Sequence, residues 1–220
     1  MIETLDGFDQ QLMLWLNYDG GSFLDVFWYT LSQKLSWVPF YIAIIAVMIM
    51  DARNERNWKK LIPLILFTAL IIAAADQLAS GLIKPLVQRP RPSHAEEIMN
   101  ELHYVNEYYG GAYGFVSSHA GNTFALAVWI SSLYRRRSVW IAMCTFALLN
   151  SYSRIYLGVH YPGDILGGAL IGALLGWLGY IGYKKTCQRM NISPNGFVNP
   201  LPIPIVFWAT IIVFMVYAAI

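Results

Sequence analysis

Three short stretches of this 220-residue chain contain the side chains needed to transfer a phosphoryl group. Together they offer an ammonium group, two guanidinium groups, two imidazoles, a carboxylate and two hydroxyls, on Lys84, Arg91, Arg154, His119, His160, Asp164, Ser117 and Ser118. Cations can clamp the nonbridging oxygens of a phosphoryl group, whose transfer needs mostly positioning and electrostatic stabilisation. Because these cations supply the positive charge that a metal ion would otherwise provide, the set predicts a metal-independent phosphoryl-transfer site.

The third stretch pairs an imidazole with a carboxylate. His160 and Asp164 are four residues apart, and Pro162 between them suits the first turn of a helix. Asp164 therefore lies within one turn of His160 and can accept a ring N–H. Such a partner fixes the tautomer and favours attack through the other ring nitrogen.

Each of these residues also has a purely structural explanation. Asp164 could complement a helix dipole, Arg154 could anchor at headgroup depth, and Ser117 could cap a helix. Taken alone, each structural explanation is the stronger one. The combination of residue types at fixed spacings in three separate stretches favours the catalytic interpretation.

The composition indicates which elements must position these residues. Hydrophobic residues make up 57% of the chain and charged residues only 13%, about half the usual charged share of a soluble protein. The apolar residues also come in long blocks. This pattern excludes a soluble globular fold, a disordered chain, collagen and a coiled coil, and it predicts an all-α membrane protein.

Six apolar blocks approach the roughly 20 residues that a membrane helix needs. We expect a single membrane-embedded domain over residues 1–220, a polytopic helical bundle of about six spans built on the blocks 35–50, 61–83, 114–134, 138–157, 165–183 and 203–220. The first block is the shortest, because its uninterrupted apolar part covers only 35–50. It must extend back through Lys34 to about Leu24 or lie where the bilayer is thin.

Residues 1–20 form a separate amphipathic segment. Leu5, Phe8, Leu12 and Leu16 recur at helical spacing, with polar residues on the other side. This pattern predicts a helix that lies in the membrane interface, or alternatively one that packs on the end of the bundle.

The basic residues predict which loops face the cytoplasm. Ten of the 15 Lys and Arg residues fall in three loops near residues 53–60, 135–137 and 184–189, which the positive-inside rule assigns to the cytoplasm. The loop 84–113 and the turn 153–164 then share the outer face. Four of the five remaining basic residues lie in these two segments, against the charge bias of that face. An anionic ligand at the membrane surface is the simplest explanation.

The three stretches resemble the signature of the type 2 phosphatidic acid phosphatase superfamily, in its membrane lipid phosphatase branch. That signature reads Lys, six residues, Arg-Pro; then Pro-Ser-Gly-His; then Ser-Arg, five residues, His, three residues, Asp. Its first and third parts match fully at Lys84 to Pro92 and Ser153 to Asp164. The middle part keeps Ser117 and His119, while Val116 and Ser118 replace the Pro and the Gly.

The resemblance implies roles for these residues. His160 would be the nucleophile of a phosphohistidine intermediate, supported by Asp164, and His119 would protonate the leaving group and then activate water. Lys84, Arg91, Ser117, Ser118 and Arg154 would bind the phosphate, with no cofactor.

The resemblance also implies a substrate class and a location. We expect hydrolysis of the terminal phosphate of a lipid phosphate or diphosphate, such as undecaprenyl diphosphate, a lipid A phosphate, phosphatidylglycerophosphate or phosphatidic acid. The alternatives are a lipid phosphotransferase and a non-catalytic lipid-phosphate transporter or binding protein. We expect a multi-pass protein of the cell membrane, the inner membrane in a Gram-negative cell, with its site facing outward and no nucleic-acid partner. The oligomeric state stays open.

Four further features are secondary. Arg89 lies outside the signature, and we expect it to contact headgroups. Asp76 lies inside a span, and we expect it to make a structural hydrogen bond. Gly168, Gly172 and Gly176 form a small-residue stripe for helix packing. Within 93–113, a capping-box pattern at Ser93 and Glu96 predicts a short helix, which is either a lid or a seated loop.

Overall fold

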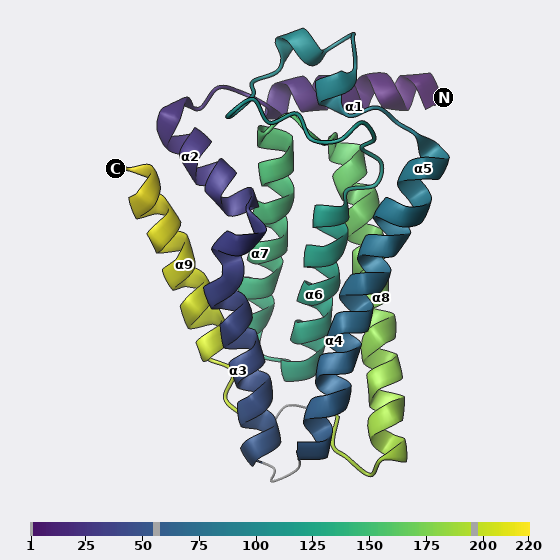
Figure 1. Ribbon diagram of the computed structural model, residues 1–220, viewed down its shortest axis with the longest axis vertical. Helices are drawn as coiled ribbons and strands as arrows, with labels where there is room; N and C mark the ends of the chain where they lie inside the picture. Colours follow the sequence, from purple (N-terminus) through teal and green to yellow (C-terminus); the bar gives the residue numbers. More distant parts are fainter. Residues whose placement is uncertain (1, 55–57, 195–197) are drawn as a thin grey trace.

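The computed structural model describes residues 2–54, 58–194 and 198–220, and most of these residues are helical (Figure 1). No strand occurs within the described ranges, and a single antiparallel bridge joins Pro90 to Tyr113. The all-α class predicted from the composition is confirmed.

The centre of the bundle consists of four long helices: α4 (Leu61–Asp76), α6 (Ser118–Tyr134), α7 (Arg137–Tyr156) and α8 (Pro162–Arg189). Helices α6 and α8 approach most closely. A Cβ added at Gly168, Gly172 or Gly176 would collide with the carbonyl oxygens of Ser117, Gly121 or Ala125. The small-residue stripe therefore serves helix packing, as its spacing predicts.

A second group of helices packs against α7. It contains α2 (Gly21–Ser32), α3 (Val38–Asn54) and α9 (Pro202–Ala218). Aromatic rings fill the space between them: Trp37 stacks on Phe207 at 6.0 Å and meets Phe146 edge-on at 4.7 Å. Such contacts add to the burial of apolar surface and hold α3, α7 and α9 together.

The first apolar block lies within the segment Lys34–Asn54, which is long and apolar enough to cross a membrane, but its extension back to about Leu24 is wrong. The helix breaks at Gln33, whose backbone is extended with φ −77° and ψ 127°, and a 3-10 turn over Lys34–Trp37 leads into α3. The indole of Trp37 donates a 2.7 Å hydrogen bond to the Leu31 carbonyl, a group that the end of α2 leaves without a helical partner.

Three segments within the described residues are long and apolar enough to cross a membrane: Lys34–Asn54, Trp58–Val87 and Pro162–Arg189. The second joins α4, a π-helical stretch Gln77–Ile83 and α5 (Lys84–Val87) into one rod. Helix α9 is apolar but has 17 residues, and α6 and α7 carry polar side chains that face the cavity described below. The count of six spans stays a prediction.

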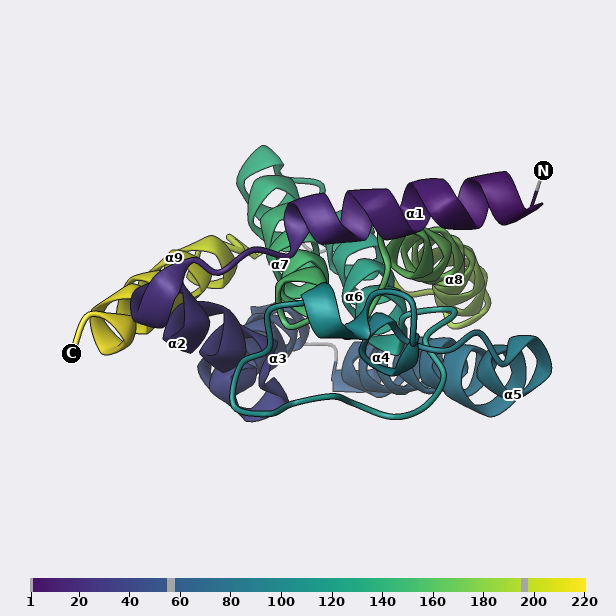
Figure 2. The ribbon, with the colours of Figure 1, turned by 90° about the horizontal axis from the view of Figure 1, so that it is seen from above.

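One end of the bundle is covered by α1 (Ile2–Leu16) and by the segment from Gln88 to Ser117 (Figures 1 and 2). Helix α1 lies across α7 and α8 and buries Met13 completely, while Leu5 and Phe8 remain exposed. It thus packs on the bundle end and still presents an apolar side outward.

The short helix predicted from Ser93 and Glu96 is wrong, because the Ser93 hydroxyl donates to the Tyr109 carbonyl at 2.6 Å and caps no helix. Only 3-10 turns form there, at Pro92–His94 and Met99–Glu101.

Candidate active site

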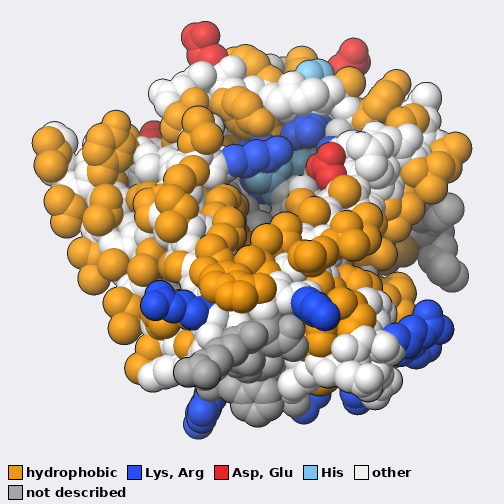
Figure 3. Space-filling view, turned by 60° about the horizontal axis from the view of Figure 1, so that its bottom comes forward, with side chains coloured by type: hydrophobic (Ala, Val, Ile, Leu, Met, Phe, Trp, Pro, Cys, Tyr) orange, Lys and Arg blue, Asp and Glu red, His pale blue; other side chains and the backbone are white. Residues whose placement is uncertain are grey.

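A cavity of about 520 Å³ opens beneath the covered end of the bundle. Figure 3 shows a hollow that contains basic and histidine side chains and is bordered by apolar ones. Six of the eight predicted site residues line the cavity: Lys84, Arg91, Ser118, His119, Arg154 and His160. Chain folding therefore brings all three stretches to one place.

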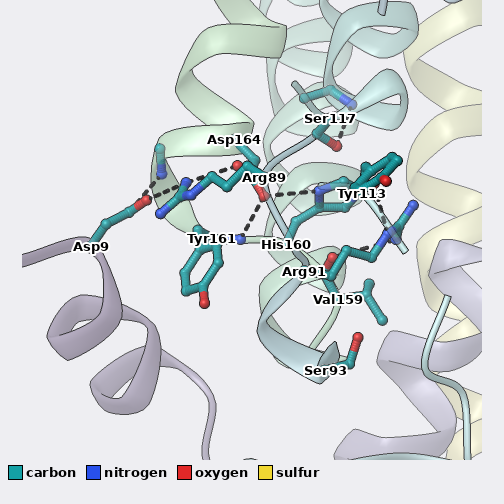
Figure 4. Close-up of polar contacts among 12 residues, drawn as sticks. Asp9, Arg89, Arg91, Ser93, Tyr113, Ser117, Val159, His160, Tyr161 and Asp164 are labelled. Atoms are coloured by element: carbon teal, nitrogen blue, oxygen red, sulfur yellow. Dashed lines mark hydrogen bonds and ion pairs between the residues drawn. The ribbon is translucent and has the colours of Figure 1, made fainter. Parts of the chain in front are cut away.

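The imidazole and carboxylate of the third stretch are in contact (Figure 4). His160 Nδ1 lies 3.3 Å from Asp164 Oδ2, and the two residues are 1% and 0% exposed. Pro162 starts α8, which places Asp164 in its first turn, where its Oδ2 also accepts the Tyr161 N–H at 3.1 Å. The hydrogen bond from the backbone keeps the carboxylate oriented toward the ring.

The surroundings of His160 keep its ring neutral. Burial lowers the pKa of His160 well below its usual range, and the nearby charges of Arg91, Arg154 and Lys84 lower it further, against a backbone hydrogen bond from Gly114 that raises it. At neutral pH the imidazole consequently retains one unprotonated nitrogen, which nucleophilic attack requires.

Four Lys and Arg residues line the cavity: Lys34, and Lys84, Arg91 and Arg154 from the predicted stretches. Arg91 donates to the carbonyls of Tyr113 at 3.1 Å and Val159 at 3.4 Å, and Arg154 donates to the Tyr108 hydroxyl at 2.9 Å. Among the described residues, neither they nor Lys84 form an ion pair. The buried Nε of Arg154 also lacks a partner there. This concentration of uncompensated positive charge suits an anionic ligand.

The pKa values outside the helices reflect this positive potential. Burial and the neighbouring Arg154 lower the pKa of Arg91. Burial raises the pKa of Tyr108, but Arg154 and Arg91 outweigh that effect, so the net pKa lies below its usual value. No spacing or motif predicted that Tyr108 is the partner of Arg154.

The second stretch forms the start of α6, and its two serines differ. Ser118 lines the cavity, and its hydroxyl lies 2.7 Å from that of Ser80. Ser117 is fully buried and caps α6, because its hydroxyl accepts the Ala120 N–H at 3.4 Å. His119 is half-buried and faces the cavity, and the first N–H groups of the helix lie beside it.

Asp76 borders the same cavity and accepts a 3.2 Å hydrogen bond from the Asn122 amide, as expected.

The expectation that Arg89 contacts headgroups is wrong. Its guanidinium does not point to headgroups but contacts Asp164 Oδ1 at 2.9 Å, Asp6 at 2.6 Å and Asp9 at 2.9 Å. The spacing of Asp6 and Asp9, three residues apart on one helix face, was the only available signal.

One group of three possible metal ligands occurs among the described residues: Asp19, Asp25 and His103, within 4.8 Å of one another. None of them lines the cavity. The Asp25 carboxylate is already engaged by His103 at 2.8 Å and by the Tyr156 hydroxyl at 2.6 Å. These contacts make the cluster a hydrogen-bonded link between α2, α7 and the segment from Gln88 to Ser117.

The profile of the PAP2 superfamily matches residues 63–187, which include all eight predicted site residues. The chain belongs to this superfamily. A lipid A 4'-phosphatase of Bacteroides thetaiotaomicron is 40% identical over 88% of this chain and 85% of its own length. A second lipid A 4'-phosphatase, from Porphyromonas gingivalis, is 33% identical over 82% and 75%.

The PAP2 fold is also seen in a solved structure. The PAP2 type phosphatidylglycerolphosphate phosphatase from Bacillus subtilis superposes with a TM-score of 0.62 and 22% identity, over 84% of this chain and 89% of that one. The chain is therefore a membrane phosphatase of the PAP2 superfamily, as the three stretches predict.

Proposed function

We propose that this protein removes a terminal phosphate from a phosphorylated saccharolipid of the lipid A type, at the outer face of the membrane. One observation carries the proposal: a buried, neutral His160 paired with Asp164 faces a cavity in which Lys84, Arg91 and Arg154 form no ion pair among the described residues. The similarity to two lipid A 4'-phosphatases favours that lipid over the other candidates.

The mechanism divides into two displacements. The unprotonated nitrogen of His160 attacks phosphorus, and the P–O bond to the lipid breaks while Asp164 stabilises the imidazolium that forms. Lys84, Arg91 and Arg154 neutralise the charge on the nonbridging oxygens. His119 donates a proton to the leaving lipid oxygen. It then takes a proton from water, which attacks the phosphohistidine and releases phosphate.

The shape of the cavity supports a lipid substrate. A second groove along α3 and α4 shares six lining residues with it: Lys34, Ile45, Thr68, Ile72, Asp76 and Asn122. Apolar side chains border the hollow in Figure 3. A lipid can thus bring its phosphate to His160 while its chains stay in an apolar environment.

A substrate panel tests the proposal. Purified protein in detergent is incubated with lipid A, undecaprenyl diphosphate, phosphatidylglycerophosphate and phosphatidic acid, and released phosphate is quantified, with His160→Ala as control. We expect the highest kcat/KM for lipid A. A higher value for another lipid would transfer the assignment to that lipid, and binding of all four without release would support a transporter instead.

Isotope labelling separates hydrolysis from phosphotransfer. In ¹⁸O-labelled water, hydrolysis places one labelled oxygen in each phosphate released. Phosphate that appears on an added lipid acceptor, without label, would identify a phosphotransferase.

The outward orientation has its own test. Single cysteines at Glu101 and Arg136 are introduced separately into a chain in which Cys144 and Cys187 are replaced, since both positions are exposed. In intact cells, a thiol reagent that cannot cross the cytoplasmic membrane is expected to label the cysteine that replaces Glu101 and not the cysteine that replaces Arg136. The reverse pattern would place the active site in the cytoplasm.

A further inference from the structure

Arg89 contacts the carboxylate that holds the proposed nucleophile. Asp164 presents Oδ2 to His160 at 3.3 Å and Oδ1 to the Arg89 guanidinium at 2.9 Å (Figure 4). The two oxygens of one buried carboxylate are thereby divided between a cation and the imidazole. Arg89 itself does not line the cavity, so it has no route to the substrate phosphate.

Helix α1 fixes the other side of the same guanidinium. Asp6 accepts from Nη2 at 2.6 Å, and Asp9 lies 2.9 Å from Nη1. The second oxygen of Asp9 accepts the Gly163 N–H at 2.8 Å, at the start of α8. The Tyr161 ring stacks beneath the guanidinium at 4.0 Å. Arg89 is therefore held from three sides, and two of its three carboxylate partners belong to α1.

A buried carboxylate is costly without a partner. Asp164 is 0% exposed, and among the described residues Arg89 is the only one that forms an ion pair with it, because the neutral His160 ring contributes a hydrogen bond. Burial lowers the pKa of Arg89, but Asp164, Asp9 and Asp6 outweigh burial and raise it overall. The guanidinium is consequently a permanent charge beside Asp164.

We infer that Arg89, anchored by Asp6 and Asp9 of α1, is a positioning residue that holds Asp164 in line with His160, and that α1 is thereby part of the active-site framework. The inference rests on the proposed roles of His160 and Asp164. Loss of the guanidinium frees Asp164 Oδ1 and leaves both remaining contacts, from Tyr161 N–H and His160, on Oδ2, so the carboxylate can turn about that oxygen and misalign with the imidazole. Misplacement by about 1 Å can cost on the order of 10²-fold in rate.

The kinetic consequence separates positioning from phosphate binding. We expect Arg89→Gln to lower kcat about 10- to 100-fold, with little change in KM or in inhibition by vanadate, a phosphate analogue. The rate of phosphoenzyme formation in rapid-quench experiments falls by the same factor. Arg89→Lys recovers part of the loss, because one ammonium can contact Asp164 but cannot also reach both α1 aspartates as the planar guanidinium does. Gln11→Ala, an exposed position on α1, is the matched control and keeps wild-type kcat.

A double-mutant cycle provides the decisive measurement. If Arg89 acts through Asp164, Arg89→Gln in an Asp164→Asn background costs less than about twofold further, since the two residues act as one unit. A loss equal to the product of the two single losses would overturn the inference and indicate a general structural role.

The α1 contribution is tested without altering Arg89. Asp9→Asn and Asp6→Asn together are expected to reduce kcat about threefold to tenfold, with folding verified by monodisperse elution in detergent. This double variant also tests the inference if Arg89→Gln does not fold. Unchanged kcat in the folded pair would remove α1 from the framework. A wild-type protein that releases no phosphate from any lipid would instead refute the proposed function.

Discussion

Two groups of basic side chains lie at the same end of this molecule and differ in what neutralises them. Arg89 is surrounded by the carboxylates of Asp6, Asp9 and Asp164. The cavity group, Lys84, Arg91 and Arg154, forms no ion pair within the part of the chain that the structure describes. Charge that protein carboxylates already neutralise stabilises the framework, whereas uncompensated charge at a cavity is available to an anionic ligand.

The contrast arises between neighbours in the sequence. Arg89 and Arg91 are separated only by Pro90, and both flank the short bridge to Tyr113, where Arg91 N–H bonds the Ala112 carbonyl and Gly114 N–H bonds the Arg89 carbonyl. The same extended segment thus supplies one arginine to the support of Asp164 and the other to the cavity.

The largest effect is expected at the residue between the two groups. His160→Ala removes the proposed nucleophile, so we expect turnover to fall by about 10⁴-fold or more. Wild-type protein quenched during turnover of ³²P-labelled substrate carries acid-labile phosphate, and the variant carries none. Substantial activity in folded His160→Ala would show that another group attacks phosphorus.

His119→Ala is expected to lose about 10²- to 10⁴-fold in kcat, the usual contribution of a general acid and base. The loss depends on the leaving group, because an aryl phosphate leaves without a proton whereas a lipid alkoxide requires one. Rates are compared for both substrates. An equal loss of kcat with the aryl phosphate and the lipid would contradict the acid–base role. It would assign His119 to phosphate binding, together with Lys84, Arg91 and Arg154.

Arg154→Ala sharpens the contrast directly, since it removes a cavity cation and leaves Asp164 supported. We expect kcat/KM to fall about 10²- to 10³-fold and vanadate inhibition to weaken, whereas Arg89→Gln leaves that inhibition intact. Inhibition constants for both variants give the comparison. Equal weakening in the two variants would abolish the distinction between the groups.

A pH profile reports the effect of the cavity group on His160. Burial and Arg91 lower the pKa of His160, so the neutral ring persists well below pH 6.5 and the acid limb of kcat/KM lies there. Arg91→Gln raises that pKa, so the protonated, inactive ring appears at higher pH. We expect the acid limb to move to higher pH. If the acid limb of kcat/KM does not move, a group other than His160 controls it.

The smallest effect is expected from metal removal. Because three cations neutralise the phosphoryl oxygens, activity after treatment with EDTA is expected to stay within about twofold of the untreated protein. The measurement is phosphate release before and after dialysis against EDTA. Activity that disappears and returns in proportion to added Mg²⁺ would show that the cavity group is insufficient.

The sequence alone predicted the features that depend on composition and short spacing. Long apolar blocks specify an all-α membrane chain, since backbone polar groups in lipid must be satisfied within helices. The alternation of these blocks brings Lys84, Arg91, His119 and Arg154 to one face. The four-residue spacing of His160 and Asp164 makes them neighbours by local geometry, because Pro162 starts a helix between them.

Tertiary packing decided the rest. Arg89 meets Asp6 and Asp164 across 83 and 75 residues, and such contacts depend on where α1 lies on α8. Packing also buries Ser117, which caps α6, whereas Ser118 faces the cavity. The break at Gln33 likewise depends on packing, because the aromatic cluster around Trp37 holds the start of α3 in place. Local spacing determines which residues are neighbours along a helix, but only the docking of helices determines which charge each carboxylate meets.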